Sequence, residues 1–285
     1  MYTLLISADE LRHLHDTAAR LVVFDCSFDL ARPQAADGLF ADVHIAGAQH
    51  AHLDRDLSTK DPALAVNGGR HPLPQREVVA HWLGRMGVDQ HTQVVVYDRQ
   101  GCHYCGRLWW MLKWLGHDAV AVLDGGLQAW QAAGGPTETG AARPPAPRPF
   151  AVREPLRQLV LTGQVARDLG QPTQTVVDAR AAARYRGDVE PLDPVAGHIP
   201  GALNRPFTDN FTADGHFKSP AQLRSEWQSI LGTGSADQVI HHCGSGVTAV
   251  PNLLAMELAG YAPTALYAGS WSEWCRTPGL PCAKG

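Results

Sequence analysis

The sequence predicts an α/β protein made of two similar domains, each a mostly parallel β-sheet flanked by helices. The chain has 285 residues, close to twice a usual domain length of about 150 residues. It also repeats itself once, and short apolar runs alternate with longer helical patterns along its whole length. With 45% apolar and 18% charged residues, the composition is that of a globular protein with enough material for two buried cores.

The repeat consists of similar segments that occur in the same order in both halves. LVVFD at 21–25, HIAGA at 44–48 and VVVYD at 94–98 are matched by TVVDA at 175–179, HIPGA at 198–202 and VIHHC at 239–243. Two copies of this length indicate duplicated domains rather than a solenoid.

The stretch between the copies is rich in Pro, Gly and Ala, which neither a helix nor a central strand sustains. It predicts an extended linker. We therefore predict an N-terminal domain over residues 1–135, a linker over 136–156 and a C-terminal domain over 157–285.

Secondary structure follows from the periodicity of the apolar residues. Strand-like runs lie at 21–25, 94–98, 119–124, 175–180, 238–242 and 264–269. Helical patterns lie at 76–86 and 248–259. Such alternation predicts parallel sheets covered by helices on both faces, with active sites beyond the carboxyl ends of the strands. Asp98 and Cys243 both lie at such an end.

Charge and cysteine content exclude several classes of protein. The formal net charge is -4 and no Lys/Arg-rich run occurs, so neither nucleic acid nor an anionic membrane surface is an expected partner. The N-terminus has no secretory pattern, and no apolar stretch approaches the ~18 residues of a membrane helix. Six cysteines are too few for a disulfide scaffold. We expect a cytoplasmic, soluble protein.

Cys243 stands in the segment with the strongest chemical signal, QVIHHCGSGVTAVPNLLAMELAG. A buried strand is followed by a short loop with Gly244 and Gly246 and then by a helix. In such a loop successive N–H groups form a nest for an anion, and the helix N-terminus points at the same place. Both effects favour a thiolate, the nucleophilic form of cysteine. The alternative is a buried structural cysteine, which the two glycines make the less favoured interpretation.

The loop CGSGVTA resembles the active-site loop of mercaptopyruvate sulfurtransferases in the rhodanese superfamily. The tandem duplication, the GHIPGA segment and the LDGG segment match this family as well. The resemblance implies two rhodanese-like domains, of which the N-terminal copy is inactive because it carries Asp98 in place of a cysteine. It implies a persulfide on Cys243 and requires neither a metal nor an organic cofactor.

The resemblance also assigns roles to further residues. Gly244, Ser245, Gly246, Val247 and Thr248 match the loop whose amides hold the sulfur. Ser245 is matched to a proton relay with an Asp and a His, for which Asp54 and His71 are the candidates; the alternative is that both are solvated loop residues. Arg184 matches the arginine that binds the anionic group of the substrate, a natural task for guanidinium.

Two neighbouring arginines have structural interpretations. We expect Arg180 to pair with a carboxylate and Arg186 to face solvent, although assistance to Arg184 is the alternative for Arg186.

The identity of the sulfur donor stays open in the sequence. Mercaptopyruvate enzymes usually have a second arginine near the position of Asp193, where this chain has an acidic residue. The loop with Ser245 favours 3-mercaptopyruvate, whereas EPLD at 190–193 resembles the thiosulfate branch. We predict an enzyme that moves sulfane sulfur from 3-mercaptopyruvate to cyanide or a thiol. Thiosulfate as donor and a non-catalytic persulfide carrier are the alternatives.

Other cysteines and histidines carry weaker signals. Cys102 and Cys105 have a C-x-x-C spacing but no second ligand pair, so we expect no zinc site, and a redox role is the less favoured interpretation. A cysteine phosphatase is a further alternative that we do not favour, because it requires an arginine where the chain has Ala249. We expect Cys26 to pack in the core and His241 and His242 to be structural.

Overall fold

The computed structural model describes residues 1–17, 20–143 and 145–285, which fold into two compact units. The first unit consists of Met1–Leu64, Pro74–Leu156 and Ala213–Phe217. The second consists of Ala65–Leu73, Arg157–Thr212 and Lys218–Gly285. Each unit therefore includes a short segment from the opposite half of the chain. The domain limits predicted from the sequence stay a prediction, and Pro144 of the proposed linker lies outside the described residues.

The first unit contains a parallel five-stranded sheet with the strand order β1-β6-β5-β2-β4. Its strands are β1 (Leu5–Ile6), β2 (Leu21–Asp25), β4 (Gln49–His50), β5 (Gln93–Tyr97) and β6 (Val120–Leu123). The short strands β3 (His44–Ile45) and β7 (Thr137–Glu138) form a separate antiparallel pair. The helices are α1 (Ala8–Thr17), η1 (Pro33–Ala35), α2 (Ala36–Asp42), α3 (Arg76–Arg85), α4 (Cys105–Trp114) and α5 (Gly126–Ala132).

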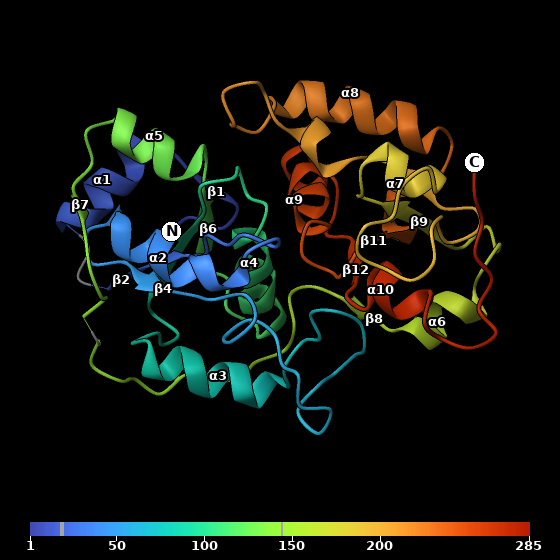
Figure 1. Cartoon of the computed structure of the whole chain (residues 1–285). Helices are drawn as coiled ribbons and strands as arrows, with labels where there is room; N and C mark the ends of the chain where they lie inside the picture. Colours follow the sequence, from blue (N-terminus) through green and yellow to red (C-terminus); the bar gives the residue numbers. More distant parts are fainter. Residues whose placement is uncertain (18–19, 144) are drawn as a thin grey trace. The chain divides into compact units, whose positions relative to one another are not determined.

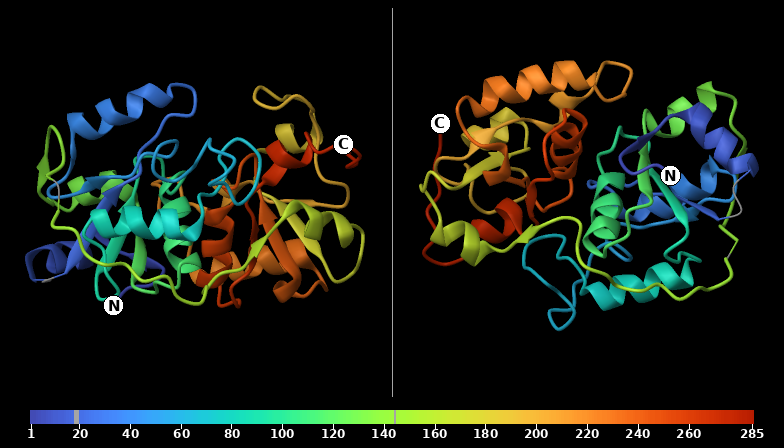
Figure 2. Two further views of the ribbon diagram at one scale, coloured as in Figure 1. Left: turned by 90° about the horizontal axis from the view of Figure 1, so that it is seen from below. Right: turned by 180° about the vertical axis from the view of Figure 1, so that it is seen from behind.

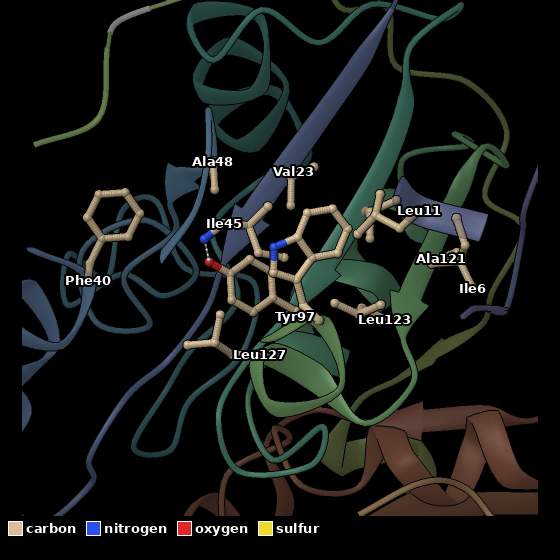
Figure 3. Close-up of a cluster of buried hydrophobic side chains, with 12 residues drawn as sticks. Ile6, Leu11, Val23, Phe40, Ile45, Ala48, Tyr97, Ala121, Leu123 and Leu127 are labelled. Atoms are coloured by element: carbon tan, nitrogen blue, oxygen red, sulfur yellow. Dashed lines mark hydrogen bonds between the residues drawn. The ribbon is translucent and has the colours of Figure 1, made fainter. Parts of the chain in front are cut away.

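Alternating side chains of the central strands supply the core of this unit. Val95 and Tyr97 belong to one buried cluster with Leu11 of α1 and Trp130 of α5. Figure 3 shows Tyr97 and Leu11 within this cluster. The Tyr97 hydroxyl accepts a hydrogen bond from the N–H of Ile45 at 3.0 Å. On the other face Phe24 packs against Trp82 of α3, which lies on the opposite side of the sheet from α1 and α5 (Figure 1). The sheet is therefore buried on both faces, as its nearly uninterrupted apolar strands require.

The second unit repeats this arrangement with the strand order β10-β9-β11-β12-β8, again with parallel pairing. Its strands are β8 (Leu159–Val160), β9 (Thr175–Asp178), β10 (Leu203–Asn204), β11 (Val239–His242) and β12 (Ala265–Tyr267). Its helices are α6 (Thr162–Arg167), α7 (Ala182–Arg186), η2 (Phe207–Asn210), α8 (Pro220–Leu231), η3 (Ala236–Gln238), α9 (Val250–Leu258) and α10 (Ser270–Trp274). Helices α8 and α9 cover one face of the sheet, and α6 and α10 cover the other (Figures 1 and 2).

The two sheets have the same strand order, since β4-β2-β5-β6-β1 corresponds to β10-β9-β11-β12-β8. This confirms the predicted α/β class with mostly parallel sheets flanked by helices. Each of the predicted strand-like runs overlaps an observed strand, and the pattern at 248–259 contains α9. Among the described residues, no helix is both long enough and apolar enough to cross a membrane.

His241 lies fully buried in the middle strand β11 between Trp227 and Met256. The pKa of His241 is lowered to about 3. Burial is the larger cause, and the neighbouring His242 is the smaller one. The folded protein therefore holds this imidazole neutral, as expected for a structural histidine. The unfolded chain takes up a proton near the ordinary value, so the contribution of His241 to stability is present above that value and is lost as the pH falls.

We predict that His241→Gln makes the protein less sensitive to mild acid. Between pH 7 and pH 5, titration of this one side chain should lower the free energy of unfolding by about 2 kcal/mol in the unaltered protein. Chemical denaturation at both pH values should show a loss smaller by that amount in the variant. His13→Gln, a change at an exposed residue, is the control. Equal losses in all three proteins would contradict the prediction.

Candidate active site

Cys243 directly follows the middle strand of the second sheet, at its carboxyl end. Its side chain is buried, with 1% of the residue exposed. The backbone N–H of Cys243 donates to Ser270 Oγ at 3.1 Å, and its carbonyl accepts from the N–H of Trp271 at 3.0 Å. The carbonyl of Gly244 accepts from the N–H of Ser272 at 2.9 Å. The start of the cysteine loop is thus fixed to the segment that opens α10.

Gly246 gives the loop its tight turn. Its φ of +72° lies in the left-handed region, where residues with a side chain are disfavoured. A Cβ atom at this position would lie 2.3 Å from the carbonyl oxygen of Ala268, a backbone atom that has little room to move. After the turn, Pro251 occupies the first turn of α9, which needs no hydrogen bond from its nitrogen. Both features follow from the sequence of the loop.

The corresponding loop of the first unit shows which kind of group the backbone N–H groups of such a loop bind. The carboxylate of Asp98 lies at the carboxyl end of the middle strand β5, at the place that Cys243 has after β11. Its Oδ1 accepts hydrogen bonds from the N–H groups of Gln100 and Cys102 at 2.9 and 3.0 Å. Its Oδ2 accepts from the N–H groups of Tyr104 and Cys105 at 2.8 and 2.9 Å. The loop therefore forms a nest for one anion, and here Asp98 supplies it.

In the second unit Cys243 stands at the position that this aspartate has in the first. By the register of the repeat, Gln100, Cys102 and Tyr104 correspond to Ser245, Val247 and Ala249. Across the part of the chain that the structure describes, the N–H groups of these three residues donate no hydrogen bond. They are available to an anion attached to Cys243. Ala249 was absent from the predicted loop contacts, while Val247 is buried and Thr248 is half-buried.

Ser245 and His71 are brought together although they lie 174 positions apart in the chain. His71 Nδ1 lies 2.7 Å from Ser245 Oγ, and both residues are buried. The segment Ala65–Leu73 is part of the second unit, which places His71 beside the cysteine loop. This pair can pass a proton between the hydroxyl and the imidazole. Its role in catalysis stays a prediction.

Asp54, the third predicted member of the relay, belongs to the first unit. Its carboxylate lies 4.0 Å from Nζ of Lys60, and its backbone N–H donates to His52 Nδ1 at 3.2 Å. Its participation in the relay stays a prediction.

Arg184 lies on α7 with its guanidinium over the cysteine loop. Nη2 donates to Glu190 Oε1 at 2.6 Å, and Nη1 lies 3.6 Å from the point that a Cβ atom on Gly244 would occupy. Burial raises the pKa of Glu190, but hydrogen bonds from Arg184 and from backbone N–H groups outweigh it, so the pKa is lowered. Glu190 therefore stays ionised and holds Arg184 in place.

Arg180 has the structural role expected from the sequence, since it binds Asp178 through Nε and Nη2 and donates to the carbonyl of Gly197. Arg186 is half exposed and pairs with Asp188, which confirms that it faces solvent.

Arg70 also lies at the cysteine loop, although no motif in the sequence selects it. Its Nη2 lies 2.9 Å from the point that a Cβ atom on Gly244 would occupy. Arg70 directly precedes His71 in the sequence. It reaches the cysteine loop because the segment Ala65–Leu73 is part of the second unit. Only its adjacency to His71 could have drawn attention to it.

The remaining cysteines lie elsewhere. Cys26, Cys102 and Cys105 are buried in the first unit, and burial raises the pKa of the Cys26 and Cys105 thiols well above the usual value. Thiols held protonated in this way are poor nucleophiles. Cys275 is half-buried and Cys282 is exposed. Within the described ranges, no group of three His, Cys, Asp or Glu side chains is arranged to hold a metal ion.

Comparison with protein families matches the chain twice, over residues 7–133 and 161–277, to the rhodanese-like domain. A protein of Pseudomonas aeruginosa named "Probable 3-mercaptopyruvate sulfurtransferase" is 43% identical, and the alignment covers 98% of this chain and 100% of that protein. A protein of Mycobacterium tuberculosis named "Putative thiosulfate sulfurtransferase SseB" is 36% identical over 99% of this chain and 97% of its own length.

Among solved structures, SseA from Escherichia coli is similar throughout. Its crystal structure was described with the rhodanese fold and the catalytic mechanism of 3-mercaptopyruvate sulfotransferases. The TM-score is 0.79 at 31% sequence identity, and the alignment covers 95% of this chain and 100% of SseA.

Proposed function

Because this chain belongs to the family of proteins with tandem rhodanese-like domains, we propose that it is a sulfurtransferase that uses 3-mercaptopyruvate as its donor and carries the sulfur as a persulfide on Cys243. The observation that carries this proposal is the position of Cys243. It precedes a loop in which, among the described residues, the N–H groups of Ser245, Val247 and Ala249 donate no hydrogen bond, and the guanidinium of Arg184 lies close to the adjacent Gly244. An anionic sulfur and an anionic substrate group thereby have neighbouring sites.

In the first half-reaction the thiolate of Cys243 attacks the sulfur of 3-mercaptopyruvate. An S–S bond forms, the C–S bond breaks, and its electron pair stays on carbon as the enolate of pyruvate. The proton of the donor thiol must reach that carbon. We assign this transfer to Ser245 and His71, which is supported by the 2.7 Å distance between Ser245 Oγ and His71 Nδ1. The products are pyruvate and a Cys243 persulfide, whose charge the loop amides stabilise.

In the second half-reaction a nucleophilic acceptor attacks the outer sulfur of the persulfide. The S–S bond breaks, the sulfur leaves with the acceptor, and Cys243 returns as thiolate. Cyanide and thiols are the proposed acceptors. Neither half-reaction requires a metal or an organic cofactor in this scheme.

Thiosulfate is the second candidate donor. The relative from Mycobacterium tuberculosis carries that activity in its name, and a guanidinium binds a sulfur oxyanion as well as a carboxylate. Against it, Ser245 adds a hydrogen-bonding group but no positive charge beside the sulfur.

The test compares the two donors in one assay, the formation of thiocyanate from cyanide by purified protein. We expect kcat/KM to be at least about tenfold higher with 3-mercaptopyruvate, a preference that one charged hydrogen bond can supply. A higher kcat/KM with thiosulfate would mean that thiosulfate is the donor, and the protein would still be a sulfurtransferase. Activity with neither donor would overturn the proposal and favour a persulfide carrier.

A further inference from the structure

A cavity of about 870 Å³ lies in the first unit, and the sulfur transfer proposed above makes no use of it. It is bounded by the carboxyl end of β4, by the chain that follows β4 as far as Leu64, and by helix α3 with the residues on either side of it. All of the residues that line it belong to the first unit. Its volume is that of sites for small organic molecules, about 300–1,000 Å³.

Apolar side chains form much of the wall of this cavity. Pro74, Val79 and Trp82 line it and are buried. Leu64 and Val78 line it too, but they are 38% and 36% exposed. Single exposed apolar side chains are common on protein surfaces, whereas an apolar patch inside a hollow is typical of a ligand site. The wall is therefore suited to a flat apolar molecule.

Two polar atoms at the cavity lack a hydrogen-bond partner. They are Nε2 of His50 and Oγ of Ser58, both buried, and neither makes a hydrogen bond within the described ranges of the chain. Both residues line the cavity. The His50 side chain is 9% exposed and Ser58 is 3% exposed. Because a buried polar group without a partner destabilises a fold, such atoms beside a cavity point to a ligand that pairs with them.

The surroundings of His50 determine which role its Nε2 has. Nδ1 lies 3.1 Å from Oδ1 of Asp37, a position that favours a proton on Nδ1. The ring stacks on Phe40 with the centroids 5.0 Å apart, which fixes its plane. Burial is the largest influence on the pKa of His50 and lowers it, although the carboxylates of Asp25 and Asp37 act in the opposite direction. The imidazole is therefore neutral at pH 7, and its Nε2 is a hydrogen-bond acceptor.

The charged side chains that line the cavity balance one another. Arg55 and Arg85 are positive, whereas Asp56 and Glu77 are negative. Arg55 lies 3.5 Å from the carboxylate of Asp56, so part of this charge is paired within the protein. The cavity thus offers no surplus of one sign to an ionic ligand, and an uncharged occupant is favoured.

We propose that this cavity is a binding site for an uncharged, flat apolar molecule that carries one hydroxyl group. The hydroxyl group donates its hydrogen to His50 Nε2 and accepts a hydrogen bond from Ser58 Oγ, so that both buried polar atoms gain a partner. Leu64, Val78 and Trp82 cover the apolar part. A carboxylate does not fit this arrangement, because it cannot donate to Nε2.

Three naphthalene derivatives test the proposal by equilibrium dialysis against the whole chain at pH 7. We expect 2-naphthol, which has the uncharged ring and the hydroxyl group, to bind at one site with a Kd below about 100 µM. We expect 2-methoxynaphthalene, which cannot donate a hydrogen bond, to bind about 3- to 10-fold more weakly. The anion 2-naphthoate should bind at least about tenfold more weakly than 2-naphthol, because its charge would be buried without a partner.

Variants of the chain locate the bound molecule. His50→Phe keeps a ring that can stack on Phe40 but removes the acceptor, so the Kd values of 2-naphthol and 2-methoxynaphthalene should come within about twofold of each other. Their ratio cancels any general change in the cavity. Ser58→Ala should weaken the binding of 2-naphthol about 3- to 10-fold. Since it removes only a hydroxyl group that makes no hydrogen bond among the described residues, this variant is expected to fold even if His50→Phe does not.

A matched pair of leucines tests the apolar wall. Leu64→Ser should weaken the binding of 2-naphthol and 2-methoxynaphthalene by a similar factor, about 3- to 10-fold, because both lose the same apolar contact. Leu161→Ser in the second unit is the control, since Leu161 is 40% exposed against 38% for Leu64, and it should leave every Kd unchanged.

Three results would overturn the proposal. The first is a failure of 2-naphthol to bind with a Kd below about 1 mM. The second is binding of 2-naphthoate as tight as that of 2-naphthol or tighter, which would mean that the site prefers an anion. The third is a set of Kd values that His50→Phe, Ser58→Ala and Leu64→Ser all leave unchanged, because the molecule would then bind elsewhere on the chain.

Discussion

Cys243→Ser is expected to lower sulfur transfer by at least about 10⁴-fold, since replacing a covalent nucleophile removes the whole reaction path rather than one contact. Serine fits the buried position and preserves the hydrogen bonds that the Cys243 backbone makes with Ser270 and Trp271. Its hydroxyl is almost entirely protonated at neutral pH, and oxygen cannot hold a transferable sulfane sulfur. The variant should therefore fold normally and fail in both half-reactions.

Mass spectrometry provides the direct measurement. After incubation with donor and no acceptor, the unaltered protein should gain one sulfur atom on the peptide with Cys243, and added cyanide should remove it. Cys243→Ser should gain none. Cys282→Ser removes the exposed cysteine and is the control that should keep full activity. Persistent turnover in Cys243→Ser would show that another cysteine carries the sulfur.

Gly246→Ala is expected to destabilise the protein by more than about 3 kcal/mol and to abolish transfer in whatever fraction folds. The added methyl group would lie 2.3 Å from the carbonyl oxygen of Ala268, and φ is +72°. The clash is with backbone, so relief requires the loop to move away from β12. Such a movement would also displace the N–H group of Ser245, which precedes Gly246, and that of Val247, which follows it.

Gly201→Ala separates the effect of backbone strain from the effect of the clash with Ala268. Gly201 has a similar φ of +77°, but a Cβ atom there would meet nothing within 4 Å. Its replacement should cost only the strain of a left-handed residue, about 1 kcal/mol, with activity retained. Thermal or chemical denaturation measures both variants. Equal losses at the two positions would mean that backbone strain, and not the contact with Ala268, limits the loop.

Local patterns in the sequence were sufficient for the central parts of the fold. The strand with His241 and His242, the glycine loop after Cys243 and the proline in the first turn of α9 are each encoded within a few residues. The duplication predicted that the two domains share one architecture, and the strand orders of the two sheets agree with this. The strand order itself was not predicted. These features depend on short-range physics, which a single sequence displays.

The substrate side of the site could not be read in the same way. Arg70 and His71 reach the cysteine loop only because a segment from the first half of the sequence folds onto the second unit. No periodicity or turn signal in GGRHPLP indicates that path. The aspartate at 193 looked like the loss of a binding residue, since sequence alone does not show that Arg70 is its partner.

The carboxylate of Asp98 occupies in the first loop the position that Cys243 has in the second. Four amide dipoles converge on it, and they would be left facing one another without an acceptor if the side chain were merely shortened. In the first copy a side chain of the sequence itself supplies the acceptor for these N–H groups, whereas in the second copy we propose that an anion attached to Cys243 supplies it. We infer that aspartate at this position keeps the loop stable without a reactive cysteine, because its carboxylate accepts all four hydrogen bonds.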